Sequence, residues 1–166
     1  MTHPGEHAGA AADAAVTASP GCILAVRTAD CAPIVLVGER TLGVVHAGWR
    51  GLLGGVVERA VEALVALDGP PLAAHLGPCI RVGCYEFDGP ERAQVAERYG
   101  PESLGVTTTG TPALDLPATA IAALHGAGVA VVHDTSGCTA CDSRWYSHRA
   151  RDEPGRIATI AWLERA

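Results

Sequence analysis

The chain has 166 residues, of which 48% are hydrophobic and 18% are charged, and its formal net charge is −6 at pH 7. This length and composition indicate one folded domain with a core of its own and exclude a disordered chain. The negative charge argues against non-specific nucleic-acid binding. We find neither an apolar run long enough to span a membrane nor a signal-peptide pattern. We therefore expect a cytoplasmic protein without membrane contact.

The hydrophobic pattern predicts strands and helices in a mixed order, without the strict alternation of a parallel α/β fold. In chain order, we expect a loose segment over 1–11, strands over 22–28, 33–37 and 42–45, a helix over 51–67, a strand over 72–76, a helix over 91–99, a surface loop over 101–112, a helix over 117–125, and strands over 129–132 and 156–163. We expect the strand over 129–132 to be buried. The last strand alternates poorly between apolar and polar residues, so we expect both of its faces to be buried as well.

The strands over 33–37 and 42–45 are joined by the turn-forming residues Gly-Glu-Arg-Thr and predict a β-hairpin. Cys31 comes just before the first strand and His46 just after the second. Pairing of the strands would bring this thiol and this imidazole to the same sheet edge. Such a pair is typical of a metal site or of a nucleophilic cysteine with its base. A buried cysteine and a hydrogen-bonded histidine without a functional role would give the same pattern.

A tryptophan and an arginine stand between glycines at the start of the predicted helix, as Gly48-Trp49-Arg50-Gly51. Glycine lets the backbone approach a ligand closely, a guanidinium suits a planar oxyanion, and a helix N-terminus favours negative charge. We therefore predict anion binding here, with a plain strand-to-helix turn as the alternative. A second corner, Gly77-Pro78, would either present backbone N–H groups to a substrate or form only a turn.

Six cysteines in so apolar a chain are expected to be reduced rather than paired in disulfides. Cys138 and Cys141 form a CxxC pair that His133 and His148 flank. We disfavour a separate zinc site here, because two of four ligands would have to come from elsewhere. Asp30 would either orient a ligand of the Cys31 site or close the turn before it. We expect the remaining cysteines to be structural: Cys22, Cys79 and Cys84.

Several motifs together resemble the YfiH-type laccase-domain family, whose members are variously described as multicopper polyphenol oxidases, purine nucleoside phosphorylases and peptidoglycan editing factors. The motifs are Ala12-Asp13-Ala14, TADC at 28–31, HAGWRG at 46–51, Gly77-Pro78-Cys79-Ile80, Cys84-Tyr85-Glu86, Leu114-Asp115-Leu116, Cys138-Thr139 and Tyr146-Ser147-His148-Arg149. The resemblance covers residues 12–166, which we take as a single domain after a loose segment over 1–11. It implies an α/β (α+β) fold, a layered α/β/β/α sandwich with mixed sheets.

The resemblance also implies a function, phosphorolysis of adenosine, inosine or methylthioadenosine with phosphate, together with adenosine deamination. Cys31 and His46 would be zinc ligands and catalytic residues, and Arg50 would hold phosphate with help from Arg149. Three further groups follow as substrate-binding elements: Gly48, Trp49 and the Gly77-Pro78 corner. The implied partners are therefore a purine nucleoside and phosphate.

Two other enzymatic functions are considered, and one of them stays open at this point. Cys31 with His46 as its base would form a cysteine hydrolase that acts on an amide bond, as the peptidoglycan-editing description suggests. Multicopper oxidase chemistry is disfavoured, because scattered histidines and a single methionine do not supply its ligand set, so copper is not the expected cofactor.

Family members usually carry a further histidine upstream of the segment that corresponds to Asp13, and this histidine completes a His–Cys–His metal site. We expect this chain to be shortened at that end. His3, His7 or a partner chain would then have to supply the third ligand, or the chain would act as a non-catalytic binding protein. A shortened fold would also expose apolar sheet surface, which favours a homo-oligomer.

Overall fold

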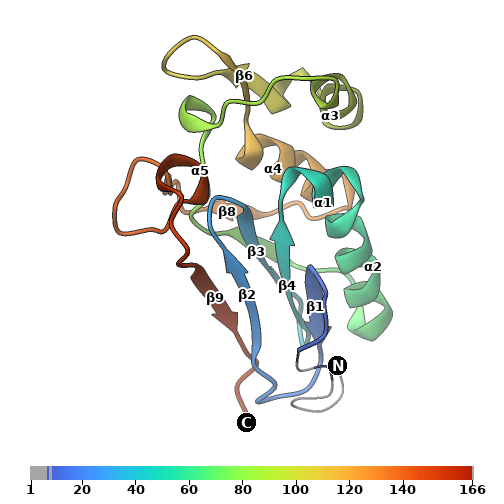
Figure 1. Cartoon of the computed structure of the whole chain (residues 1–166). Coiled ribbons are helices and arrows are strands. Elements are labelled where there is room, and N and C mark those ends of the chain that lie inside the picture. The colour runs from blue at the N-terminus through green and yellow to red at the C-terminus, as the bar shows by residue number, and fades with distance from the viewer. Residues whose placement is uncertain (1–6, 8, 166) are drawn as a thin grey trace.

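The centre of the computed structural model, which describes residues 7 and 9–165, is a five-stranded mixed sheet (Figure 1). Its strand order is β1-β4-β3-β5-β8. The strands are β1 (Ala14–Thr17), β3 (Ala32–Val37), β4 (Leu42–Ala47), β5 (Ala73–Leu76) and β8 (Val132–Asp134). β5 and β8 run parallel, whereas β1 with β4, β4 with β3 and β3 with β5 run antiparallel. The predicted hairpin is thus the pair β3–β4 near the middle of the sheet.

A second, two-stranded sheet packs on one face of the main sheet. It pairs β2 (Leu24–Thr28) with β9 (Ile157–Ala161) in antiparallel register. Leu24 and Val26 of β2 contact Val44 of β4 and form a small buried cluster. The outer face of this sheet is exposed, since side chains alternate between inside and outside along both strands. The expectation that the last strand is buried on both faces was therefore wrong, because β9 has a partner sheet on only one side.

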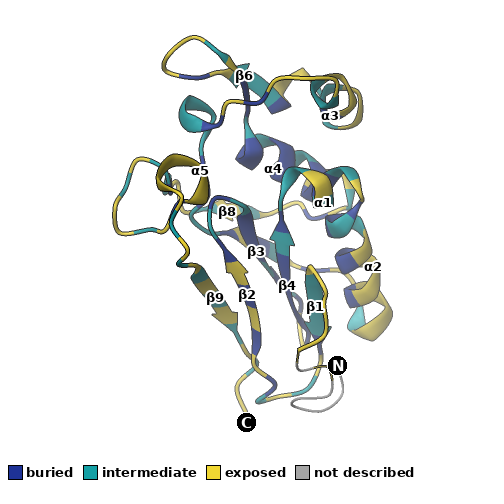
Figure 2. Cartoon of the chain, viewed as in Figure 1, coloured by how far each residue is buried: buried dark blue, intermediate teal, exposed yellow. Residues whose placement is uncertain are grey.

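Helices cover the opposite face of the main sheet and enclose the larger core (Figures 1 and 2). They are α1 (Trp49–Leu53), α2 (Val56–Asp68) and α4 (Leu116–Gly126). Leu64 of α2 packs beside Gly43 of β4, and Leu124 of α4 and Leu76 of β5 are fully buried in the same core. The single helix expected over 51–67 is broken, because Gly55 takes a left-handed conformation with φ of 79°. The apolar period continues across this break, so periodicity alone did not reveal it.

The rest of the chain forms short elements above the sheet: η1 (Val82–Cys84), α3 (Glu91–Tyr99), η2 (Pro101–Ser103), β6 (Leu104–Val106), β7 (Pro112–Leu114) and α5 (His148–Arg151). The segment 101–112, expected as a surface loop, contains part of the hairpin β6–β7. The strand expected over 129–132 begins later. The Val129 N–H donates to the Leu124 carbonyl and closes the end of α4, and β8 is an edge strand that is only partly buried.

The fold class that the resemblance implies, an α+β fold with a mixed sheet, is confirmed, although among the described residues the outer face of the second sheet is exposed where the implied sandwich has a further helix layer. The chain is a small α+β protein, with a mixed sheet between helices on one face and a second sheet on the other. Within the part of the chain that the structure describes, no helix has both the length and the apolar character needed to cross a membrane. The boundary between a loose segment over 1–11 and a domain over 12–166 stays a prediction, because most of that segment lies outside the described residues.

Candidate active site

The β3–β4 hairpin brings Cys31 and His46 together. In the register of the two strands, Ala32 lies opposite Ala47 and Pro33 lies opposite His46. Cys31 therefore lies at the same open end of the hairpin as the imidazole. A hydrogen bond links the Cys31 sulfur to the His46 ring. Both side chains are half-buried, which leaves them open to a small ligand. The structure thus places the two predicted residues in direct contact, while their catalytic roles stay predictions.

Asp13 holds the other side of the His46 ring. Its Oδ1 lies 2.9 Å from His46 Nδ1, and the backbone N–H of His46 donates to the Asp13 carbonyl over 2.7 Å. Because a carboxylate can only accept, Nδ1 carries a proton, and Nε2 is the nitrogen left to face Cys31. Hydrogen bonds to Cys31 and then to Asp13 raise the pKa of His46 to about 9, against the opposing effect of burial. The imidazole is therefore held in one orientation and readily protonated.

Asp30 anchors the turn that precedes Cys31. It has a positive φ of 80°, and its carboxylate is almost completely buried. It accepts hydrogen bonds from the hydroxyls of Thr139 and Ser147, both at 2.7 Å, and from the backbone N–H of Arg149 at 2.6 Å. Asp30 thus ties three residues of the C-terminal loops to the turn that presents Cys31. The two roles considered from the sequence, orienting a ligand of the Cys31 site and closing the turn, both stay predictions.

A pocket of about 340 Å³ lies over the Cys31–His46 edge. It gathers the predicted residues Gly48, Trp49, Arg50 and Arg149 from two distant parts of the chain. The remaining lining residues are Asp13, Ala29, Asp30, Gly51, Tyr85 and His148, in addition to Cys31 and His46 themselves. Two guanidinium groups therefore stand beside one thiol and one imidazole, an arrangement that suits an anionic ligand.

The two guanidinium groups are each stacked on an aromatic ring. Arg50 Cζ lies 4.3 Å from the centre of the Trp49 ring, and Arg149 Cζ lies 5.1 Å from that of Tyr85. Trp49 in turn packs edge-on against Phe87, with ring centres 5.3 Å apart. Stacking restricts the side-chain freedom of both arginines and leaves their planar N–H groups available to a ligand.

The Gly77-Pro78 corner lies elsewhere. Among the described residues that line the pocket, neither Gly77 nor Pro78 is present. The Gly77 N–H donates to the Pro33 carbonyl over 2.9 Å, and a Cβ on Gly77 would lie only 2.8 Å from Pro33 Cγ. Pro78 packs beside Gly137. The corner thus packs closely against the start of β3, and its assignment to substrate binding stays a prediction.

Three of the lining residues were not singled out from the sequence, although each of them lies within one of the family motifs. Asp13 lies within the Ala-Asp-Ala segment, but its contact to His46 depends on the pairing of β1 with β4. Tyr85 follows Cys84 and is buried, and this burial raises the pKa of its phenol. His148 is exposed and lies 3.3 Å from Asp152. Local spacing does not predict that these three residues share one pocket, because segments distant in the chain bring them together.

Of the two histidines predicted as replacements for the third ligand, the structure describes only His7. His3 lies outside the described residues. His7 lines a different hollow, together with Cys22 and Val26. Whether either residue completes a site with Cys31 and His46 stays untested.

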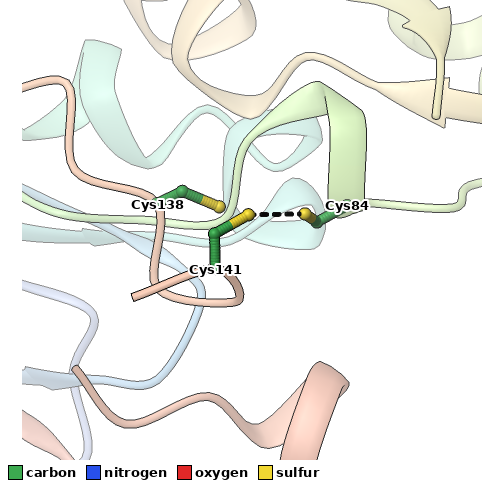
Figure 3. Close-up of side chains that lie close together, drawn as sticks. All are labelled: Cys84, Cys138 and Cys141. Carbon is green, nitrogen blue, oxygen red and sulfur yellow. Dashed lines mark hydrogen bonds between the residues drawn. The ribbon is translucent and has the colours of Figure 1, made fainter. Parts of the chain in front are cut away.

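A second cluster of side chains that could bind a metal lies outside the residues that line this pocket (Figure 3). The sulfurs of Cys84, Cys138 and Cys141 all lie within 4.8 Å of one another, so this cluster could hold a metal ion. In residues 7 and 9–165 it is the one group of three or more such ligands with this spacing. From the sequence we expected a structural role for Cys84, and the CxxC pair supplied only two of the four ligands of a zinc site. The structure shows that Cys84 is close enough to supply one of them.

Comparison with known proteins places the chain in a family. Residues 2–164 match the family model described as multi-copper polyphenol oxidoreductase laccase. The chain belongs to this laccase family. It is 41% identical over 158 residues to a Streptomyces griseus protein named purine nucleoside phosphorylase ORF3, and the match covers 93% of this chain and 64% of the relative. The chain thus spans less than two thirds of the length of that laccase-family relative.

Solved structures of the laccase family show the same fold. YlmD from Geobacillus stearothermophilus matches with a TM-score of 0.82 and 29% identity, over 92% of this chain and 61% of that one. YfiH from Bacillus licheniformis matches with a TM-score of 0.80 and 25% identity, with the same coverage of 92% and 61%. The resemblance to the YfiH-type family that the motifs indicated is thereby confirmed.

Proposed function

We propose that the chain belongs to a purine nucleoside phosphorylase that cleaves the N-glycosidic bond of adenosine, inosine or methylthioadenosine with phosphate. The name of the Streptomyces griseus relative, at 41% identity, supports a phosphorylase. The observation that carries the proposal is the shared pocket, in which Arg50 and Arg149 stand beside Cys31 and His46. Because this chain spans only 64% of that relative, the activity is proposed for the protein as a whole.

Phosphate would occupy the side of the pocket that carries the two guanidinium groups. Arg50 and Arg149 offer planar N–H groups that match phosphate oxygens, and their aromatic neighbours orient them. In the reaction, a phosphate oxygen forms a bond to the anomeric carbon of the ribose. The bond from that carbon to the purine nitrogen breaks, and the base leaves with the electron pair. Holding both reactants in one pocket lowers the entropic part of the barrier.

Cys31 and His46 fit zinc in the nature of their donor atoms. A thiolate and an imidazole are usual zinc ligands, and a ligating histidine usually donates its other ring N–H to a carboxylate, as His46 does to Asp13. Cys31 Sγ and His46 Nε2 would therefore hold the ion, as two of the three protein ligands that a catalytic zinc requires. A zinc ion there would supply Lewis-acid polarisation of a bound oxygen or a water of lowered pKa.

A cysteine hydrolase is the second candidate, and the Asp13 contact favours it. Asp13, His46 and Cys31 follow one another in the order of a catalytic triad: the carboxylate orients the ring, and the ring contacts the thiol. In this case Cys31 would attack the carbonyl carbon of an amide, and the amine would leave after taking up a proton. The same two contacts serve a zinc ligand, so geometry alone does not separate the candidates.

Incubation of the purified protein with adenosine and phosphate tests the first proposal. We expect adenine and ribose 1-phosphate in equal amounts, lost in Cys31→Ala and Arg50→Ala. Arg59→Ala is the matched control, because Arg59 is exposed on α2 and does not line this pocket. Inosine as the product, without release of base, would indicate deamination instead.

A parallel assay separates the other candidates. Cleavage of a peptidoglycan-derived amide that depends on Cys31 and survives metal chelation would favour the hydrolase. If the folded protein shows none of these activities, the phosphorylase proposal is wrong for this chain and a binding role remains.

A further inference from the structure

Three cysteine sulfurs converge from two loops that are far apart in the sequence (Figure 3). Cys84 ends η1, and its sulfur lies 3.0 Å from that of Cys141, although the two residues are 57 positions apart. Cys138 and Cys141 stand on either side of one turn, in which the Asp142 N–H donates to the Cys138 carbonyl. A CxxC turn directs both sulfurs to one side, which is the usual half-site of a structural metal centre.

Hydrogen bonds hold the two loops in place independently of the sulfurs. Arg81 forms a two-pronged ion pair with Asp134, with both N···O distances at 2.6 Å, and its Nε donates to the Gly137 carbonyl. Cys79 and Gly137 extend the contact, since the Cys79 N–H donates to the Gly137 carbonyl. The loop that bears Cys84 is therefore held against the loop that bears the CxxC pair. A ligand set built on such a scaffold is preorganised.

The turn that bears Cys138 and Cys141 is supported on one side and open on the other. Arg151 donates to the Ala140 carbonyl over 2.9 Å and supports the turn from outside. Cys141 is exposed, whereas the other two cysteines are half-buried. The exposed side offers both an entry path and a fourth coordination position for water.

We propose that Cys84, Cys138 and Cys141 form a metal site of their own, separate from the Cys31–His46 pair, for a thiophilic d10 cation, zinc(II) or copper(I). Soft thiolates select these ions over magnesium, calcium or manganese. Three sulfur ligands would complete a trigonal copper(I) site, or would leave one open position on a tetrahedral zinc.

The site would have a structural role beside the candidate active site. Tyr85 follows Cys84 directly and lines the active-site pocket, and Thr139 lies between the two cysteines of the turn and donates to Asp30. Asp30 precedes Cys31 in the chain and also holds the backbone of Arg149. A cation on the three sulfurs would therefore fix two walls of the pocket at once, without contact to the substrate.

Cobalt(II) titration of the reduced protein tests the proposal, because thiolate-to-cobalt charge transfer gives an absorption band that imidazole and carboxylate ligands lack. The protein is the Cys31→Ala/His46→Ala double variant, which removes the other pair of donors. We expect the band to saturate at about one cobalt per chain and to be displaced by zinc. In a second titration, copper(I) is added under anaerobic reducing conditions. Comparison of its affinity with that of zinc shows which of the two ions the protein binds more tightly.

Cys84→Ser and Cys141→Ser, made in the same double variant, should each reduce the band and the bound metal to a small fraction. Cys22→Ala is the matched control, because Cys22 is buried in the small cluster under β2 and should leave the titration unchanged. Cys141 is exposed, so its serine variant should keep the wild-type circular-dichroism spectrum, which separates ligand loss from misfolding.

The proposal is overturned by either of two results. In the first, the reduced and folded double variant binds neither cobalt nor copper(I) through thiolates. In the second, it binds them equally well after Cys84→Ser and Cys141→Ser. Because none of these measurements uses substrate, failure of the phosphorylase proposal would not affect them.

Discussion

His46 Nδ1 lies 2.9 Å from Asp13 Oδ1, and this contact decides which nitrogen of the ring faces Cys31. Asp13 precedes β1 and His46 is the penultimate residue of β4, so the antiparallel pairing of these two strands creates the contact. It fixes the ring for zinc ligation and for proton transfer alike. Replacement of Asp13 therefore probes both candidate functions.

Asp13→Asn should reduce kcat/KM by about 10- to 100-fold if His46 is a metal ligand, because a carboxylate that orients a ligating histidine contributes on that scale. The amide can still accept a hydrogen bond but does not favour the protonated ring. A loss nearer about 10⁴-fold, insensitive to chelators, would instead favour the triad of a cysteine hydrolase. Asp68→Asn is the control, since Asp68 pairs with Arg40 on a remote surface. An unchanged kcat/KM in Asp13→Asn would contradict both functions.

The raised pKa of His46 predicts how the stability of the metal-free protein depends on pH. The folded protein holds a proton on His46 up to about pH 9, whereas the unfolded chain releases it near 6.5. Protonated His46 therefore contributes fully to the free energy of unfolding below about pH 6.5, and this contribution is lost as the pH rises through about 9. Urea midpoints measured across this range should fall more steeply in the wild type than in His46→Gln. Parallel slopes in the two proteins would show that His46 is not stabilised as a cation.

Gly48→Ala should disturb the site without unfolding the protein. The backbone of Gly48 is extended, so alanine is allowed there, but its Cβ would lie only 3.0 Å from Cys31 Sγ. The sulfur must move by a few tenths of an ångström, and displacements at a reacting centre reduce rates by up to about 100-fold. We expect a loss of kcat/KM with little change in the thermal midpoint.

Gly126→Ala is the matched control for that change. Gly126 ends α4, and a Cβ there would meet no atom within 4 Å. Alanine in a helix is favoured over glycine by about 0.5–1 kcal/mol, so this variant should be slightly more stable and fully active. If both variants lose activity equally, the contact to the sulfur is not the cause.

The candidate site could be predicted from the sequence only where local pairing determines it. The turn between the two apolar strands fixes their register, and the register alone brings Cys31 to His46. The helix Glu91–Tyr99 was predicted with the bounds that the structure shows, since Gly89-Pro90 precedes it and Gly100 ends it. In both cases neighbouring residues carry the information.

Contacts between distant segments could not be predicted in this way. Cys84 meets the CxxC turn through the arrangement of two loops, and no pattern within either loop indicates the other. The same holds for Asp30, whose three partners come from residues more than 100 positions later. The break at Gly55 was missed for another reason, because the apolar period of the helix continues on both sides of the glycine.

Arg50→Lys should raise the KM for phosphate more than it changes kcat. Lysine keeps the charge but loses the planar fork and the stacking on Trp49, which lies 4.3 Å away. A hydrogen bond to a charged group contributes about 1.5–3 kcal/mol, which corresponds to roughly 10- to 100-fold in affinity. Initial rates at varied phosphate measure this effect, and Arg59→Lys on α2 is the control. A change in the nucleoside KM alone would place Arg50 at the base instead.

Thr139→Val should destabilise the fold through Asp30. The Thr139 hydroxyl is fully buried and donates to the Asp30 carboxylate over 2.7 Å, so valine removes a charge-assisted hydrogen bond that contributes about 1.5–3 kcal/mol. Urea denaturation should show a loss of this size. Thr41→Val is the control: its hydroxyl is also buried but has no hydrogen-bond partner among the described residues, so stability should hold or rise. Equal losses in the two variants would mean that packing, rather than the link to Asp30, makes Thr139 important.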